Sequence, residues 1–223
     1  MVRLNLDLRF AYIATEGFIA RRHAEIALRR LDHTAEEVRG LVLAELQDSP
    51  FAQDEVERDI AFQEIYLLEE ELPRLELYGT FFVLFAVFES VVKRLPKYVV
   101  KNAAPPALTR DFIANATRYY RDLLGVLLFA TAADEEFFRM LSDVRTAIAH
   151  ATGNISLLNP TVRRRFDEQW LRKYEGLAIR DEHLVISPDL ILRSAKTIEE
   201  ALRSLVGRLQ QAYPPHRRRR SKR

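Results

Sequence analysis

His150 is the histidine of this sequence whose neighbours have the side chains needed for chemistry. It lies in the segment DVRTAIAHATGNI, five residues after Arg145 and four residues after Thr146. Imidazole titrates near neutral pH and can move a proton, whereas a guanidinium group binds phosphate in a planar fork. The pattern therefore predicts a candidate phosphodiester site, in which Arg145 neutralises charge and His150 transfers a proton.

Spacing alone gives that site weak support. The chain contains 28 Arg and 6 Lys, so a given histidine has an arginine five positions earlier about one time in eight by chance. A histidine in the last turn of a helix also interacts favourably with the helix dipole without any catalytic role. A structural role and a catalytic role for His150 both stay open at this point.

The helix that must position these residues is predicted to run from Glu135 to Ala151. Asp134 is its expected N-cap, and Gly153 is expected to close its C-terminal end. A helical wheel separates an apolar face from a polar one. The apolar face carries Phe137, Met140, Leu141, Val144 and Ile148, and the polar side carries Ser142, Arg145, Thr146 and His150.

Glu89 is a second candidate, because it directly follows the apolar run Leu77–Phe88. It shares a helix face with Phe82, Phe85 and Val92. A buried, unpaired carboxylate costs several kcal/mol, so we expect Glu89 to pair with Arg145 or with an arginine of another helix. Such a pair can be structural, by fixing helix register, or it can serve catalysis.

The rest of the chain is predicted to be helical, apart from one small hairpin at Gly176–Ser187 with its turn at Arg180–His183. The other expected helices cover residues 6–31, 34–46, 54–72, 75–95, 110–117 with a continuation to 129, 160–174 and 188–213. Their expected limits are a capping box of Thr34 with Glu37, a break or kink at Pro73, a cap at Thr109, and the starts Asn159-Pro160 and Ser187-Pro188.

Composition narrows the class of protein. The chain has 223 residues, of which 48% are hydrophobic and 30% charged, as in a globular domain with a core. The absence of cysteine excludes a disulfide scaffold, a thiolate zinc site and a cysteine nucleophile, and only seven glycines argue against an all-β fold. The apolar run Leu77–Phe88 is shorter than the ~18 residues of a membrane span, which predicts a core helix. We therefore expect a soluble cytoplasmic protein without membrane, metal or cofactor.

The formal net charge of +2 conceals an uneven distribution. Residues 214–223 carry six basic and no acidic side chains, which leaves 28 basic against 32 acidic side chains in the other 213 residues, a net charge of −4. The basic residues of this tail are Arg217, Arg218, Arg219, Arg220, Lys222 and Arg223. If RNA is the substrate, we expect the tail to give non-specific, salt-sensitive attraction to it; otherwise the tail is a disordered end that aids solubility.

The segment VRTAIAHATGNI resembles the signature of the HEPN superfamily, the higher eukaryotes and prokaryotes nucleotide-binding domain. In that signature an Arg is followed after four to six residues by a His, often as RNxIxH, with Gly and Asn soon after. The matching residues are Arg145, Ile148, His150, Gly153 and Asn154, and Thr146 stands where Asn is common. Leu77–Leu95 and Pro160–Tyr213 are also similar to segments of bacterial HEPN-like proteins. The resemblance covers about Leu75–Tyr213.

This resemblance implies an all-α, HEPN-like helical bundle that acts as a homodimer. Residues 1–73 are then N-terminal helices packed on the same domain or part of it, 74–213 the HEPN-like domain, and 214–223 a basic disordered tail. The implied activity is a metal-independent endoribonuclease of a toxin or antiviral-defence system, with attack by the RNA 2′-hydroxyl. Arg145 and His150 are the implied catalytic residues, supported by Thr146, Glu89 and Asp143.

Two alternatives stay open beside the ribonuclease. Some HEPN domains are non-catalytic modules that bind nucleic acid or a partner protein, for example a nucleotidyltransferase antitoxin. The chain can also be a plain helical interaction protein in which the match of Arg145 and His150 is coincidental. The three hypotheses predict different results with RNA. The ribonuclease cleaves it, the non-catalytic module binds nucleic acid or a partner protein without cleavage, and the plain interaction protein does neither.

Overall fold

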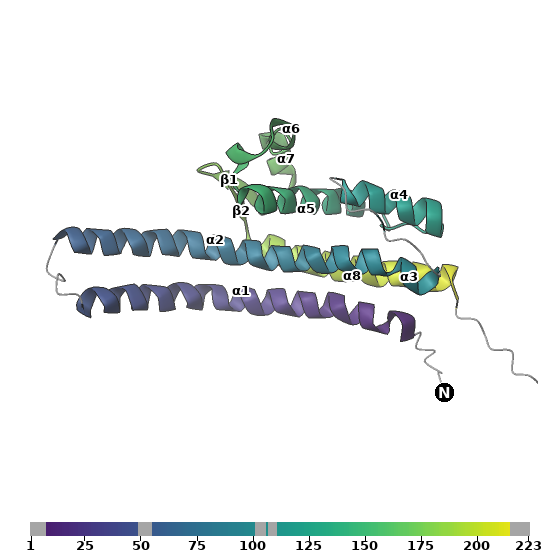
Figure 1. Ribbon diagram of the computed structural model, residues 1–223, viewed down its shortest axis with the longest axis horizontal. Helices are drawn as coiled ribbons and strands as arrows, with labels where there is room; N and C mark the ends of the chain where they lie inside the picture. The colour runs from purple at the N-terminus through teal and green to yellow at the C-terminus, as the bar shows by residue number, and fades with distance from the viewer. Residues whose placement is uncertain (1–7, 49–54, 101–105, 107–110, 215–223) are drawn as a thin grey trace, which may run out of the picture. The chain divides into compact units, whose positions relative to one another are not determined.

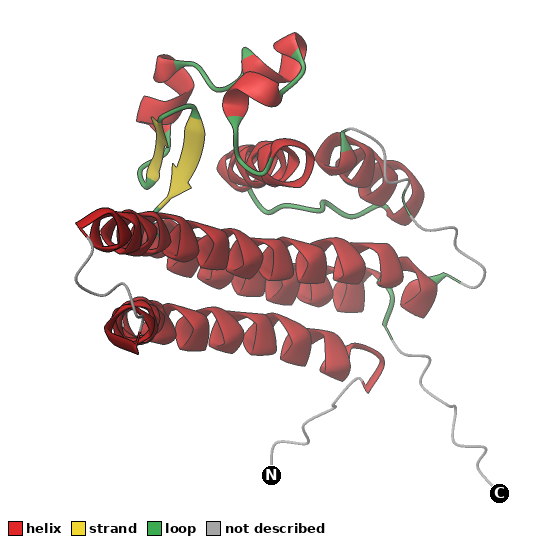
Figure 2. Cartoon of the chain, turned by 60° about the vertical axis from the view of Figure 1, so that its left-hand side comes forward, coloured by secondary structure: helices red, strands yellow, loops and turns green. Residues whose placement is uncertain are grey.

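The computed structural model describes residues 8–48, 55–100, 106 and 111–214. Helices dominate this part of the chain, and a two-stranded sheet accompanies them (Figure 1, Figure 2), which confirms the predicted all-α class. The elements are α1 Leu8–Asp48, α2 Glu55–Arg94, α3 Pro96–Val99, α4 Phe112–Leu124, α5 Ala132–Ala151, the 3₁₀ turn η1 Ile155–Leu157, α6 Pro160–Arg163, α7 Glu168–Lys173, β1 Leu177–Arg180, β2 His183–Ile186 and α8 Pro188–Ala212.

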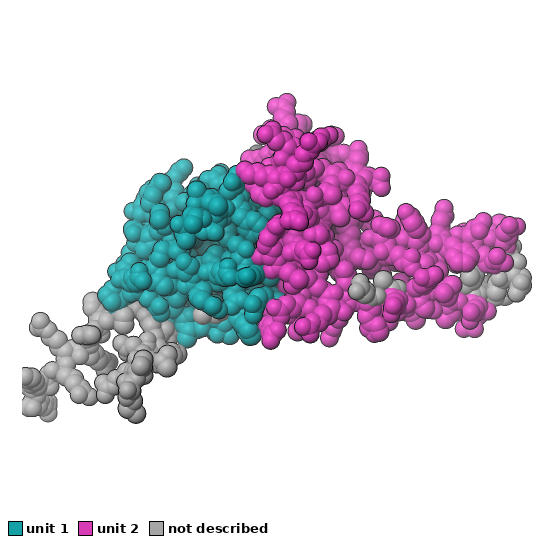
Figure 3. Space-filling model, turned by 180° about the vertical axis from the view of Figure 1, so that it is seen from behind, with its two compact units in different colours: residues 1–21, 84–146, 194–223 teal, residues 22–83, 147–193 magenta. Residues whose placement is uncertain are grey.

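The chain forms two compact units, each assembled from distant parts of the sequence (Figure 3). Unit 1 comprises residues 1–21, 84–146 and 194–223, and unit 2 comprises residues 22–83 and 147–193. Helices α1, α2, α5 and α8 therefore each contribute to both units. The predicted division of the chain at residues 73 and 213 stays a prediction.

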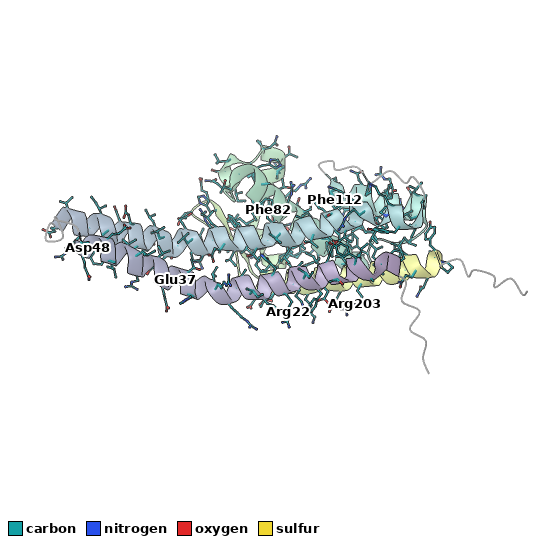
Figure 4. All side chains as sticks on the ribbon, turned by 60° about the horizontal axis from the view of Figure 1, so that its bottom comes forward. Arg22, Glu37, Asp48, Phe82, Phe112 and Arg203 are labelled. Atoms are coloured by element: carbon teal, nitrogen blue, oxygen red, sulfur yellow. The ribbon has the colours of Figure 1, made fainter. Side chains whose placement is uncertain are left out.

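Helix α1 is continuous where two helices were predicted. The expected capping box at Thr34 is wrong, because the Thr34 hydroxyl donates to the carbonyl oxygen of Arg30 at 3.0 Å instead of accepting from a following amide. A threonine that bonds to the carbonyl four residues earlier stays compatible with the helix interior. Arg22, Glu37 and Asp48, labelled along α1 in Figure 4, are all exposed.

Helix α2 is also continuous, so of the two outcomes predicted for Pro73, a break or a kink, the break is wrong. A proline inside a helix costs about 3 kcal/mol, and burial of apolar side chains elsewhere on α2, such as Ile65 and Leu77, can offset that cost. A window within Arg58–Val99, of mean hydropathy 1.7, is long and apolar enough to cross a membrane, and 50% of it is buried inside the structure. Leu77, Tyr78, Leu84 and Phe88 are among the buried side chains, as expected of a core helix.

The core of unit 1 is an aromatic cluster, which we define as Phe85, Phe88, Phe112, Phe129 and Phe138. The ring centroids of Phe88 and Phe138 are 4.3 Å apart, and those of Phe129 and Phe138 are 4.8 Å apart. Phe138 is fully buried, whereas Phe137, which was predicted to face the core, is half-buried. These two side chains differ by about 100° around α5, so only one of them points into the cluster.

Polar contacts fix the segments of unit 1 around that cluster. The Tyr120 hydroxyl donates to the Val92 carbonyl oxygen at 2.7 Å and links α4 to α2. Glu199 of α8 is buried and forms ion pairs with Arg21 at 3.0 Å and with Arg203 at 2.6 Å. A Cβ atom on Gly17 would lie 3.3 Å from the Cα of Glu199, so glycine allows α1 and α8 to approach closely here.

The starts of α4 and α5 differ from the predicted caps. Asp111 caps α4 by accepting from the amide of Ala114 at 3.2 Å, and the predicted cap Thr109 lies outside the described residues. The helix then ends at Leu124 rather than continuing to residue 129, because Gly125 adopts a left-handed conformation with φ 64°. Thr131 and Asp134 cap α5 reciprocally, each bonding to the other's amide at 3.0 Å, so Asp134 lies inside the helix.

Unit 2 contains the predicted hairpin. Strands β1 and β2 pair antiparallel with Leu177 opposite Ile186, and their turn residues Asp181 and Glu182 both have positive φ. Asn159 caps α6 as predicted, but the expected helix to residue 174 is wrong. It is divided into α6 and α7, because Asp167 accepts from the Trp170 amide at 2.8 Å and starts a second helix.

The other part of unit 2 is the helix pair, which we define as residues 22–48 of α1 and 55–83 of α2. An ion pair of 3.4 Å between Arg39 and Glu69 joins the two antiparallel segments, which lie side by side in Figures 1 and 2. Large apolar side chains are exposed along it, including Ile26, Leu41, Val56, Ile60, Phe62, Tyr66, Leu67 and Leu75. The described residues therefore leave much of the apolar surface of the helix pair uncovered.

Candidate functional site

The C-terminal end of α5 has the form that the sequence predicts. The amide of Gly153 donates to the carbonyl oxygen of Ala147 at 3.1 Å, and the amide of Thr152 donates to that of Ile148 at 3.0 Å. Gly153 has a φ of 78°, which a residue without Cβ adopts at little cost. These bonds close the helix directly after His150 and thereby fix the backbone that carries the imidazole.

Tyr78 makes glycine necessary at position 153 for a second reason. The Tyr78 hydroxyl donates to the Leu184 carbonyl oxygen, and a Cβ atom on residue 153 would overlap that hydroxyl and the ring. Burial raises the pKa of the Tyr78 phenol, so the group stays a hydrogen-bond donor. Tyr78 of α2 thus packs against the turn that follows the candidate site and ties it to β2.

The backbone after His150 is anchored to the hairpin. The Leu184 amide donates to the Gly153 carbonyl oxygen at 2.8 Å, and the Ile155 amide donates to that of Glu182 at 2.7 Å. The Asn154 side-chain oxygen accepts from the amide of Ser156 at 2.9 Å and from its hydroxyl at 2.6 Å. Gly153 and Asn154, which match the signature, therefore have structural roles in this turn.

Arg145 and His150 both lie on α5 outside its buried face. Arg145, in unit 1, is half-buried, and His150, in unit 2, is exposed, whereas the intervening Ala147 and Ile148 are buried. Neither side chain forms a hydrogen bond or ion pair with any residue that the structure describes. Five residues of helix rotate the side-chain direction by about 500°, so the two groups point about 140° apart.

Of the predicted supporting residues, Thr146 and Asp143 interact with neighbouring residues, whereas Glu89 forms no ion pair with a described residue. The Thr146 hydroxyl donates to the Ser142 carbonyl oxygen at 2.8 Å. Asp143 is half-buried and contributes to raising the pKa of Arg139, after the larger effects of Glu135. Glu89 is half-buried and, in the part of the chain that is described, has no ion-pair partner, so the expected pairing with an arginine is wrong. Partial exposure explains this, because solvent can stabilise the carboxylate.

The remaining histidines lie on other elements or outside the described residues. The structure places His23 and His33 on the exposed surface of α1, and His33 lies 3.3 Å from Glu37. His183 is half-buried in β2, with Nδ1 2.9 Å from the Asp181 carbonyl oxygen. His216 and the basic tail Arg217–Arg223 lie outside the described residues.

A pocket that the sequence reasoning missed lies beside the hairpin, and we call it the hairpin pocket. Its volume is about 600 Å³, and Ile155, five residues after His150, is the first residue of its lining. Arg163 and Arg164 also line it. The run of three arginines at 163–165 is the sequence feature that could have indicated this pocket. The sequence alone does not show that two of them lie beside an apolar cavity, because folding brings the other lining residues to them.

Comparison with known families, with curated proteins and with solved structures finds no match for this chain. Within the described residues, no group of three or more His, Asp or Glu side chains is arranged to hold a metal ion.

Proposed function

We propose that this protein is a metal-independent endoribonuclease of the HEPN type that acts as a homodimer in a toxin or defence system. The RNA 2′-hydroxyl would attack the adjacent phosphorus while the bond to the 5′-oxygen breaks. The products are a cyclic phosphate and a free 5′-hydroxyl. One proton leaves the attacking hydroxyl and one reaches the departing oxygen, and His150 takes part in this transfer.

The observation that carries the proposal is the availability of Arg145 and His150. Many arginines of this chain are engaged by carboxylates, as Arg139 is by Glu135 and Arg203 by Glu199. Arg145 has no such partner among the described residues, so its guanidinium group is able to bind a phosphate. His150 is exposed in the last turn of the same helix and is accessible to a substrate.

The experiment compares the wild type with Arg145→Ala and His150→Ala on single-stranded RNA in the presence of EDTA. We expect cleavage by the wild type and a loss of at least 100-fold in each variant. His23→Ala is the matched control, because His23 is also an exposed helical histidine and has no arginine at that spacing. Cleavage that is unchanged in both site variants would contradict the assignment.

The homodimer has its own test, because Arg145 and His150 point in different directions on one helix. If each site combines Arg145 of one copy with His150 of the other, mixing the two inactive variants restores one intact site per mixed dimer. After mixing equal amounts and full subunit exchange, about half of the dimers are mixed and each has one of its two sites intact, so we expect recovery of about a quarter of the wild-type activity. No recovery would assign both groups to a single copy.

A non-catalytic binding module is the second candidate function, and Thr146 favours it. Its hydroxyl proton is used in the bond to Ser142, whereas an asparagine at this position would offer an amide donor and an acceptor. Thr146→Asn is expected to raise the cleavage rate if the chain is an enzyme. RNA or partner binding without cleavage by the wild type or by this variant would support the binding module.

A further inference from the structure

The hairpin pocket combines an apolar lining with a basic rim inside unit 2. Its apolar lining is formed by Ile155, Leu158, Pro160, Phe166 and Ile179. A volume of about 600 Å³ lies within the range of cavities that hold small ligands. The pocket is therefore large enough for one nucleotide.

The two arginines of the rim are available to an anion. Arg163 and Arg164 are exposed, and neither side chain forms a hydrogen bond or ion pair with another described residue. Arg172 and Arg193 of the same unit differ, because the first pairs with Glu168 and the second donates to the Glu175 carbonyl oxygen. Adjacent free guanidinium groups favour a phosphate ligand.

The remaining lining suits a base more than a bare anion. Phe166 is buried and held by an edge contact with Trp170, with ring centroids 4.9 Å apart, so this wall is fixed in position. Glu182 lines the pocket as well, and its carboxylate can accept a hydrogen bond from a base amino or ring N–H group. An isolated anion would gain nothing from either feature.

We propose that the hairpin pocket binds one nucleotide of an RNA strand, with its phosphate on Arg163 and Arg164 and its base against the apolar lining. This inference builds on the proposed function, because it assigns a subsite to the same substrate. The lining starts five residues after His150, and that connection is anchored to the hairpin by a bond that the Gly153 carbonyl oxygen accepts and a bond that the Ile155 amide donates. The pocket would then hold the strand at a fixed register relative to His150.

Binding is measured without cleavage, so that the two proposals can fail separately. The probe is a fluorescein-labelled RNA oligonucleotide with every 2′-hydroxyl methylated, which removes the attacking group, and fluorescence anisotropy gives its Kd. The test variants are Arg163→Ala/Arg164→Ala and Ile179→Trp, which fills the pocket without changing charge. The matched control is Arg29→Ala/Arg30→Ala, an adjacent pair of exposed arginines of unit 2 outside the pocket.

We expect both pocket variants to raise Kd at least tenfold and the control to change it less than twofold. Adenosine 5′-monophosphate should compete with the probe at lower concentration than inorganic phosphate does. Equal losses in the two arginine pairs, equal competition by phosphate, or no binding by the wild type would each overturn the inference. Wild-type binding in the pocket without cleavage of unmodified RNA would contradict the proposed ribonuclease alone.

Discussion

The aromatic cluster of unit 1 and the helix pair of unit 2 use similar side chains in opposite ways. Phe88 is 1% exposed and is surrounded by other aromatic rings, whereas Phe62 is 56% exposed on the same helix α2. The helix pair buries Ala24, Ala61 and Ile65, but leaves Leu41 and Tyr66 largely exposed. Hydrophobicity of a segment therefore does not by itself show which part of this chain forms a core.

Replacing one phenylalanine in each region tests that contrast directly. Phe88→Ala should lower the free energy of unfolding by about 3 to 5 kcal/mol, because it leaves a cavity between several rings. Phe62→Ala should change it by about 0.5 kcal/mol or less, since an exposed side chain loses few contacts. Urea unfolding followed by circular dichroism measures both values.

Phe88→Leu is the graded control if Phe88→Ala fails to fold, and it should cost less than the alanine variant. Equal losses at positions 62 and 88 would contradict the contrast. That result would mean that the exposed face of the helix pair is covered in solution.

Unit 2 also contains a closely packed position, Gly153, although much of its helix pair is exposed. Gly153→Ala should destabilise the protein by about 2 kcal/mol or more, because it adds left-handed strain and an overlap with Tyr78. Gly125→Ala is the matched control, since Gly125 also has positive φ but no atom within 4 Å of an added Cβ. It should cost about 1 kcal/mol, from strain alone. Similar losses at both positions would remove the role assigned to Tyr78.

A third prediction uses the buried phenol of unit 1. Burial raises the pKa of Tyr120 well above its ordinary value, so the folded state favours the protonated phenol more than the unfolded state does. This contribution to stability is fully present below pH 10 and is lost as the pH rises above it. Tyr120→Phe should cost about 1 kcal/mol at pH 7, through the lost bond to Val92, and should make stability fall less steeply above pH 10.

Urea unfolding at a series of pH values measures this effect, and absorbance at 295 nm follows tyrosinate formation. Tyr66→Phe is the control, because Tyr66 is 65% exposed in the helix pair. It should leave both the stability and its alkaline slope unchanged. An identical alkaline slope in the wild type and in Tyr120→Phe would show that Tyr120 does not contribute to it.

Local sequence signals predicted those features that depend on adjacent residues. Gly153 at the end of α5, the Asn159 cap, the hairpin and the Ser187 start of α8 are all of this kind. Thr34 and Asp134 were misassigned, because a hydroxyl or carboxylate near a helix start has more than one possible backbone partner. The same sequence therefore permits a cap or an interior position, and tertiary packing decides.

The candidate site, too, could be predicted only where it depends on local spacing along one helix. The positions of Arg145 and His150 outside the buried face of α5 followed from helical spacing, and the structure confirms that placement. The hairpin pocket did not follow from spacing, because its lining combines residues 155–166 with the hairpin residues 179 and 182. Hydrogen bonds between Gly153–Ile155 and β2, with its preceding turn, help to bring those segments together.

The ion pairs of the two regions differ in burial, and loss of the exposed pair should change stability the least. Glu69→Gln should change the free energy of unfolding by less than about 0.5 kcal/mol, because the Arg39–Glu69 pair of the helix pair is exposed and separated by 3.4 Å. Glu199→Gln in unit 1 should cost at least about 1 kcal/mol, since the buried carboxylate holds both Arg21 and Arg203. Added salt should reduce the Glu69 effect further and leave the Glu199 effect nearly unchanged, because solvent ions screen an exposed pair more than a buried one. A loss at Glu69 as large as that at Glu199 would mean that the helix pair depends on this contact to stay closed.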